Sequence, residues 1–162
     1  MLAHRVGDVR LLKWMADAIP DPELAQKANF NVARYTTDQS ERVHRYELAG
    51  QGPNLELAAQ SAYEGGMSAH SNGDEVVAER LLRRGAELMT YGDGEDVVFN
   101  RNGGTAAMVL SRVLSGRGRK TEAIEVAQTV RDCEIADRSF RESASGLIAI
   151  FESAQAREIA TL

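Results

Sequence analysis

The sequence predicts an all-α fold, a right-handed stack of antiparallel helical hairpins forming an α-solenoid of about eight helices. The first reason is an internal repeat: small residues at positions 66, 73, 78 and 85 recur at 111, 118, 123 and, less strictly, 130, at a constant offset of 45. Small side chains at such spacings let two helices approach closely across a tight turn. The second reason is composition, because few aromatic residues and many alanines and glycines suit closely packed helices better than a β-sandwich.

Three helices are expected in the first 50 residues. Apolar residues recur at helical spacing after a cap at Asp8. Asp21 is followed by a proline, the usual cap and first residue of a helix. Asp38 and Glu41 stand three residues apart, as a capping box requires. The expected helices run from 8 to 20, from 21 to about 33 and from 38 to about 50, and we interpret residues 1–50 as atypical capping helices of the stack.

Two repeat hairpins follow, at residues 54–90 and 104–133. In the first, Asn54 caps one helix, residues 72–73 form the turn and Asp74 caps the next helix. In the second, helices are expected at 105–114 and 121–132, with the turn at 115–119. A terminal helix is expected at 138–160, so that residues 1–162 form a single helical-repeat domain.

The segment between the hairpins, residues 91–104, contains four glycines and a short apolar run at 97–99. We expect an irregular surface loop held by one or two apolar anchors. Its acidic residues are Asp93, Glu95 and Asp96. An EF-hand calcium loop requires glycine where Val98 stands, so these carboxylates are interpreted as solvated.

The two hairpins resemble the tetratricopeptide repeat family, whose units are helix pairs of 34 residues. The family's usual aromatic residue near the start of the first helix is replaced by Ala62 and Ala107. The offset of 45 exceeds the family's period by 11 residues, which the loop at 91–104 would absorb. The matching positions are Gly66, Ala69, Gly73, Ala78, Leu82 and Gly85 in one unit, and Ser111, Leu114, Gly118, Ala123, Ala127 and Val130 in the next.

This resemblance implies a non-catalytic interaction module that binds a peptide or a partner's helix in a concave groove lined by the first helix of each pair. An aromatic ring, two methionines and one arginine would give the groove an adaptable, mildly basic surface. The alternative that Tyr63, Met67 and Met108 pack in the core stays open. The expected partner-binding residues are Gln60, Tyr63, Met67, His70, Thr105, Met108, Arg112 and Ser115.

Two other functions stay open. A weaker similarity, to the helical sensor halves of bacterial transcription regulators, rests on Trp14, Met15 and the Leu-Ala-Gln run at 24–26. It implies a sensor or effector domain. Glu41 and His44 form one Glu-x-x-His pair, as in metal-dependent helical-bundle oxidoreductases, although such bundles need the pair twice and two further carboxylates.

Composition limits the partners. A net charge of −5 argues against general binding to phosphate backbones, although basic residues gather between Arg112 and Lys120. The single cysteine, Cys133, fits a reducing compartment, and no apolar run approaches the roughly 20 residues of a membrane span. We therefore expect a cytoplasmic protein without catalytic activity or cofactor. Its partner would be a protein or peptide, with direct nucleic-acid contact unlikely and homo-oligomerisation left open.

Overall fold

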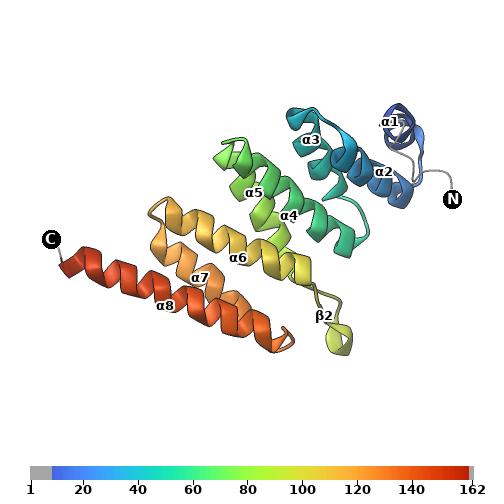
Figure 1. Cartoon of the computed structure of the whole chain (residues 1–162). Coiled ribbons are helices and arrows are strands. Elements are labelled where there is room, and N and C mark those ends of the chain that lie inside the picture. Colours follow the sequence, from blue (N-terminus) through green and yellow to red (C-terminus); the bar gives the residue numbers. More distant parts are fainter. Residues whose placement is uncertain (1–8, 161–162) are drawn as a thin grey trace.

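The fold was analysed in a computed structural model that describes residues 9–160. Within that range the chain is all-α with eight helices, as the sequence predicts, and has one small antiparallel hairpin of two-residue strands (Figure 1). The expected cap at Asp8 lies outside the described residues. The elements are α1 (Val9–Ala18), α2 (Pro22–Tyr35), α3 (Gln39–Ala49), α4 (Leu55–Ser71), α5 (Glu75–Glu87), β1 (Thr90–Tyr91), the short 3-10 helix η1 (Gly94–Asp96), β2 (Val98–Phe99), α6 (Arg101–Gly116), α7 (Lys120–Arg131) and α8 (Arg138–Ala160).

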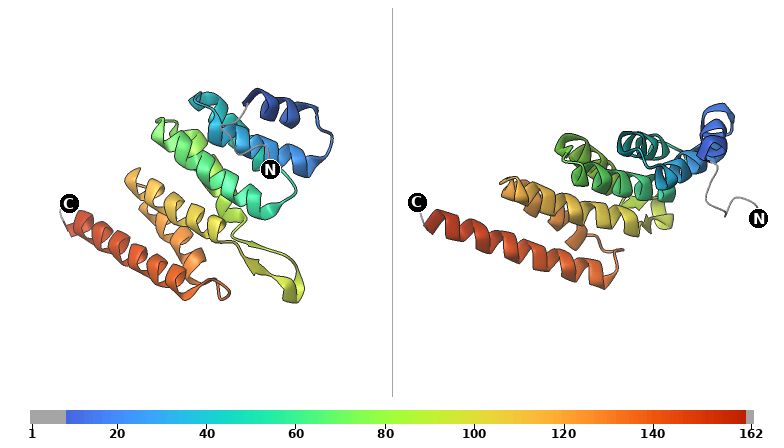
Figure 2. Two further views of the ribbon diagram at one scale, coloured as in Figure 1. Left: turned by 45° about the vertical axis from the view of Figure 1, so that its right-hand side comes forward. Right: turned by 45° about the horizontal axis from the view of Figure 1, so that its top comes forward.

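Each helix packs against the next one along the chain, and α4 also packs on α6. The helices therefore follow one another in sequence order, with α1 and α8 at opposite ends of the row (Figure 2). The main core joins α5 to α8 and includes the fully buried Leu82, Leu110 and Leu114. A second cluster joins α2 to α3, where the rings of Phe30 and Tyr46 meet edge to face at 5.8 Å.

The predicted caps form as local chemistry dictates. Asp38 accepts a hydrogen bond from the backbone N–H of Glu41 at 2.9 Å. The other half of the capping box is replaced, because the Glu41 carboxylate accepts from Thr36 Oγ1 and pairs with Lys13 Nζ at 2.7 Å. Asp21, Asn54 and Asp74 each accept from the backbone N–H three residues on.

The turns after α4 and α6 share one backbone conformation. Gly73 and Gly118 have φ of +78° and +77°, in the left-handed region that favours glycine. Each glycine donates its N–H to the carbonyl three residues back at 3.0 Å, and the next residue donates to the carbonyl five residues back at 3.0 Å. This is a Schellman motif, formed twice with the same bonds 45 residues apart. The two turns that the sequence repeat places 45 residues apart therefore share one backbone conformation.

The start of the second hairpin was predicted too late. Helix α6 begins at Arg101, where Asn100 caps it by accepting from the N–H groups of Asn102 and Gly103. Gly103 lies in the first turn of this helix, and a Cβ at that position would lie 2.5 Å from the Cα of Met89. The glycine that suggested a loop is instead required for close packing against the segment that follows α5.

The segment expected as an irregular loop contains the β1–β2 hairpin. Thr90 pairs with Phe99 and Tyr91 with Val98. Phe99 is an apolar anchor, since its ring meets that of Phe140 edge to face at 5.2 Å. The hairpin projects beyond the amino-terminal end of α6 (Figure 1).

Candidate partner-binding groove

The structure brings three of the predicted binding residues into one hollow. Helices α4 and α6 pack side by side, and between their carboxyl-terminal halves lies a hollow of about 560 Å³. Met67 and His70 line it from α4 and Arg112 from α6. Val109 of α6 adds a partly exposed apolar side chain, whereas Val113, also beside the hollow, is 8% exposed and belongs to the main core. We call this hollow the apolar half of the groove.

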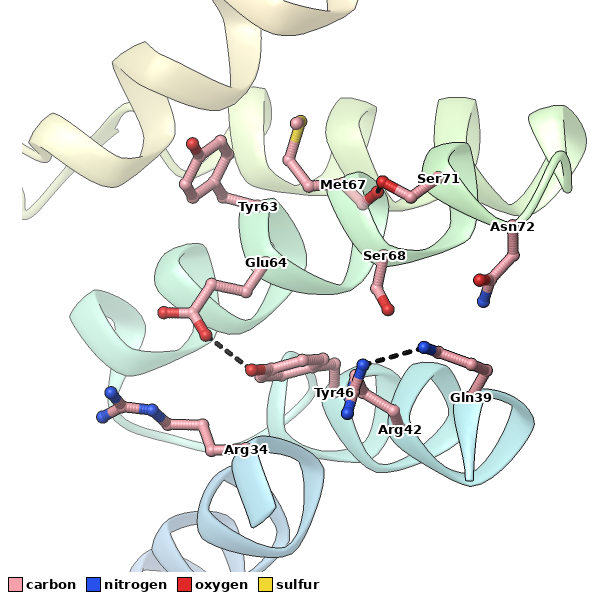
Figure 3. Close-up of a pocket in the computed structure, with 10 residues that line it drawn as sticks. All are labelled: Arg34, Gln39, Arg42, Tyr46, Tyr63, Glu64, Met67, Ser68, Ser71 and Asn72. Atoms are coloured by element: carbon pink, nitrogen blue, oxygen red, sulfur yellow. Dashed lines mark hydrogen bonds between the residues drawn. The ribbon is translucent and has the colours of Figure 1, made fainter. Parts of the chain in front are cut away.

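A second hollow, of about 470 Å³, lies between α4 and the α2–α3 pair (Figure 3). Two predicted residues, Tyr63 and Met67, border it. Most of its other lining is polar, so we call it the polar half of the groove. Because Met67 lines both hollows, the two halves adjoin across α4. The remaining lining residues of the polar half are Arg34, Gln39, Arg42, Tyr46, Glu64, Ser68, Ser71 and Asn72.

Three predicted residues of α6 and one of α4 lie outside the groove. Met108 is only 7% exposed and belongs to the main core, so the prediction that it lines a surface is corrected. Thr105 turns its hydroxyl back to the carbonyl of Arg101 at 2.8 Å, and Ser115 borders neither hollow. Gln60 lines a separate hollow at the amino-terminal end of α4 and donates to Glu64 at 2.9 Å.

Four lining residues were not predicted from the sequence: Val109, Val113, Arg34 and Arg42. Val109, Val113 and Gly116 stand at i, i+4 and i+7, the same helical spacing as the stripe containing Met108, but one residue further along. That alternative stripe was a usable signal. Arg34 and Arg42 gave no signal, because their role depends on how α2 and α3 lie against α4.

The groove gathers arginines that lack a carboxylate partner. Within residues 9–160, Arg34, Arg42 and Arg112 form no ion pair. The Arg34 guanidinium lies 5.7 Å from the centre of the Phe30 ring, a cation–π contact. Arg42 donates to the carbonyls of Ala33 and Thr36 and to the side chain of Gln39, all neutral oxygens. Arg112 is exposed.

The acidic residues bordering the groove already have partners. Glu64 accepts a hydrogen bond from the Tyr46 hydroxyl at 2.5 Å (Figure 3) and a second one from Gln60. Burial and the neighbouring Glu64 carboxylate raise the pKa of Tyr46, so the phenol stays protonated and keeps donating. Glu75 lies 2.9 Å from Nδ1 of His70. The partners of these two carboxylates are a phenol, an amide and an imidazole, so the carboxylates keep negative charge, and the three arginines leave the groove with only a small positive excess.

The basic turn around residues 115–120 is different, because its arginines are paired. Glu79 receives Arg117 at 2.7 Å and Arg119 at 2.6 Å, and it also pairs with Arg83. Arg119 pairs with Glu122 as well, at 2.6 Å. These contacts join α5 to the turn and to α7, so they are part of the fold.

The Glu41–His44 pair does not form a metal-binding arrangement. Glu41 is engaged by Lys13 and lies 3.8 Å from Arg45, and these cations and the Thr36 hydroxyl keep the pKa of its carboxyl below the usual value. His44 is exposed. Across the part of the chain that the structure covers, no three His, Cys, Asp or Glu side chains come together as a metal site would require. No helix between residues 9 and 160 combines the length and apolarity needed to span a membrane.

Comparison with known proteins adds no relative. No family model matches the chain, and no curated protein or solved structure matches it either. The resemblance to tetratricopeptide repeats therefore stays a prediction based on the internal repeat.

Proposed function

We propose that the protein is a non-catalytic interaction module, a tetratricopeptide-like α-solenoid that binds an acidic or amphipathic peptide, or a helix of another protein, in the groove. The observation that carries this proposal is the presence of three arginines without carboxylate partners beside the partly exposed side chains of Met67 and Val109. The pair of identical Schellman turns supports the solenoid part of the proposal.

The two halves of the groove suit different parts of one ligand. Met67 and Val109 offer an apolar surface to a leucine-like side chain, and methionine adapts to several shapes. Arg34 and Arg42 offer guanidinium donors, which bind carboxylates with charge-assisted hydrogen bonds. A segment that carries an apolar residue and acidic residues on one face would occupy both halves.

The proposal is tested with labelled synthetic helical peptides and fluorescence anisotropy. One peptide has leucines on one face and glutamates beside them; its control has lysine in place of each glutamate. We expect only the glutamate peptide to bind, with an affinity that falls as salt rises. Equal binding of both peptides, or binding of neither, contradicts the proposed function.

Charge reversal at one arginine locates the binding surface. Arg112→Glu should weaken binding of the glutamate peptide by about tenfold or more, since it replaces attraction with repulsion. The matched control is Arg141→Glu on α8, an exposed arginine outside the groove. Tyr63→Ala should cost about 1–2 kcal/mol of binding free energy, as expected for a truncated aromatic at an interface. Circular dichroism of each variant checks that the fold is kept.

A sensor or effector domain is the second candidate function. The polar half alone, at about 470 Å³, has the size of a small-molecule site, and its arginines favour an anionic ligand. A ligand confined to that half would lose affinity in Arg42→Ala and keep it in Arg112→Glu. A groove-spanning peptide would lose affinity in both variants.

A further inference from the structure

We infer that the apolar half of the groove binds the β1–β2 hairpin (residues 90–99) of a second copy of this chain, so that copies associate head to tail. This inference rests on the proposed function, because it names the acidic, partly apolar segment that the groove would accept.

The hairpin has the required chemistry. Asp93, Glu95 and Asp96 are exposed at its tip, and none of them forms an ion pair with another residue of the 9–160 range. Val97 and Val98 follow directly and are 39% and 48% exposed. Three free carboxylates beside two exposed valines make this segment both acidic and apolar.

The groove is complementary in both respects. Arg112 supplies a guanidinium without a carboxylate partner among the described residues, and carboxylates are the anions that guanidinium groups bind best. Val109 and Met67, both partly exposed, supply the apolar contacts. The hairpin carboxylates would contact the Arg112 guanidinium, and the hairpin valines would contact the apolar side chains of the groove. Such matching of charge and polarity is typical of specific interfaces.

The hairpin is also held in shape before binding. Its strands pair at two positions, and within the turn the Asp96 N–H donates to the Asp93 carbonyl at 3.1 Å. The Phe99 ring anchors its base against Phe140. A segment that is already ordered loses less conformational entropy when it binds.

The geometry requires a second copy. The hairpin leads into α6 at Arg101, whereas Arg112 lies 11 residues along the same helix, about 16 Å at 1.5 Å per residue. The hairpin projects from the amino-terminal end of α6 (Figures 1 and 2), whereas the apolar half is lined by residues of the carboxyl-terminal half of that helix. Because donor and acceptor surfaces differ, such contacts add copies in a chain or close a ring.

Sedimentation velocity over a range of protein and salt concentrations tests the inference. The wild type should self-associate as concentration rises, and salt should weaken the association. Arg112→Glu should remove the acceptor and the triple change Asp93→Lys, Glu95→Lys, Asp96→Lys should remove the donor. Each should weaken self-association by about tenfold or more, whereas Arg141→Glu should leave it unchanged.

Charge-swap rescue gives the sharper result. A chain that carries both Arg112→Glu and the triple lysine change in the hairpin should self-associate again. An equimolar mixture of the Arg112→Glu variant and the triple-lysine variant should form mixed assemblies. A wild type that stays monomeric, association that ignores both charge reversals, or failure of the combined variant to recover overturns the inference.

The glutamate peptide separates this inference from the proposed function. A monomeric wild type that still binds the peptide through Arg112 refutes the hairpin as occupant and leaves the groove's function standing. Loss of both self-association and peptide binding refutes both. In the outcome that supports both, the glutamate peptide competes with self-association and dissociates the assemblies.

Discussion

Replacing Gly103 by alanine should destabilise the protein, although it adds one methyl group to a helix. A Cβ at this position would lie 2.5 Å from the Cα and 2.6 Å from the backbone N of Met89. Backbone atoms cannot rotate aside as a side chain does. To reach an ordinary contact, the start of α6 and the segment after α5 must separate by about 1 Å.

The expected magnitude combines two opposing effects. Overpacking of this kind costs about 1–3 kcal/mol, and removing a glycine from a helix returns about 0.5–1 kcal/mol. The net loss should be about 1–2 kcal/mol. For a chain of this size, each kcal/mol moves the melting temperature by about 2–4 °C, so Gly103→Ala should melt about 2–8 °C lower.

Gly146→Ala in α8 is the matched control, because it makes the same chemical change in open space. No described atom outside its own helical turns lies within 4 Å of a Cβ added there. It should gain about 0.5–1 kcal/mol and melt slightly higher than the wild type. Thermal unfolding followed by circular dichroism compares the three proteins. If Gly103→Ala melts as high as Gly146→Ala, the close approach of α6 to Met89 is wrong.

Three further changes probe other parts of the fold. Ala123→Leu should lower the free energy of unfolding in urea by about 1–3 kcal/mol, because Ala123 is fully buried at the α6–α7 crossing. The same change at the exposed Ala149 should be nearly neutral, and equal effects of the two changes would contradict the crossing. Hydrogen bonds from Arg119 and nearby cations hold the pKa of the Glu79 carboxyl below its usual 4.5. The stability that this carboxylate contributes is therefore present above pH 4.5 and is lost as the pH falls through the lower pKa of the folded state. Glu79→Gln should lose less stability in acid than the wild type, and an unchanged pH profile would argue against the ion pairs. Phe99→Ala should lower the free energy of unfolding by roughly 2 kcal/mol and speed amide hydrogen exchange in the hairpin, because it removes the ring contact with Phe140. Unchanged exchange would show that other contacts hold the hairpin.

Helices and turns were predictable from the sequence wherever their causes are local. The caps at Asp21, Asn54 and Asp74 act on backbone N–H groups three residues away, so the residue types alone reveal them. The turn glycines at 73 and 118 are likewise explained by their own backbone, which has a positive φ at both positions. The helix starts after these caps and the two glycine turns followed from these signals, whereas the start of α6 did not.

What could not be predicted depends on residues far apart in the chain. Gly103 was read as a loop residue because the reason for it, the backbone of Met89, lies 14 residues earlier in a different element. The rotation of α6 about its axis decides whether Met108 or Val109 faces the groove. The sequence does not fix this rotation, because the stripes that contain Met108 and Val109 are similar in polarity. Arg34 and Arg42 reach the groove only through the packing of α2 and α3 beside α4.

Charge shows most clearly why tertiary structure decides function here. The sequence concentrates its basic residues between Arg112 and Lys120, which drew attention to the turn. In the fold, Glu79 engages Arg117 and Arg119, whereas Arg112, one helical turn earlier, has no carboxylate within reach among the described residues. A paired arginine contributes little field at a distance, because its carboxylate cancels it, but an unpaired one keeps its full attraction for an anion. Under the proposed function, the residue of this basic run that would attract an acidic partner is therefore the one that the fold leaves unpaired, and a count of charges along the sequence cannot identify it.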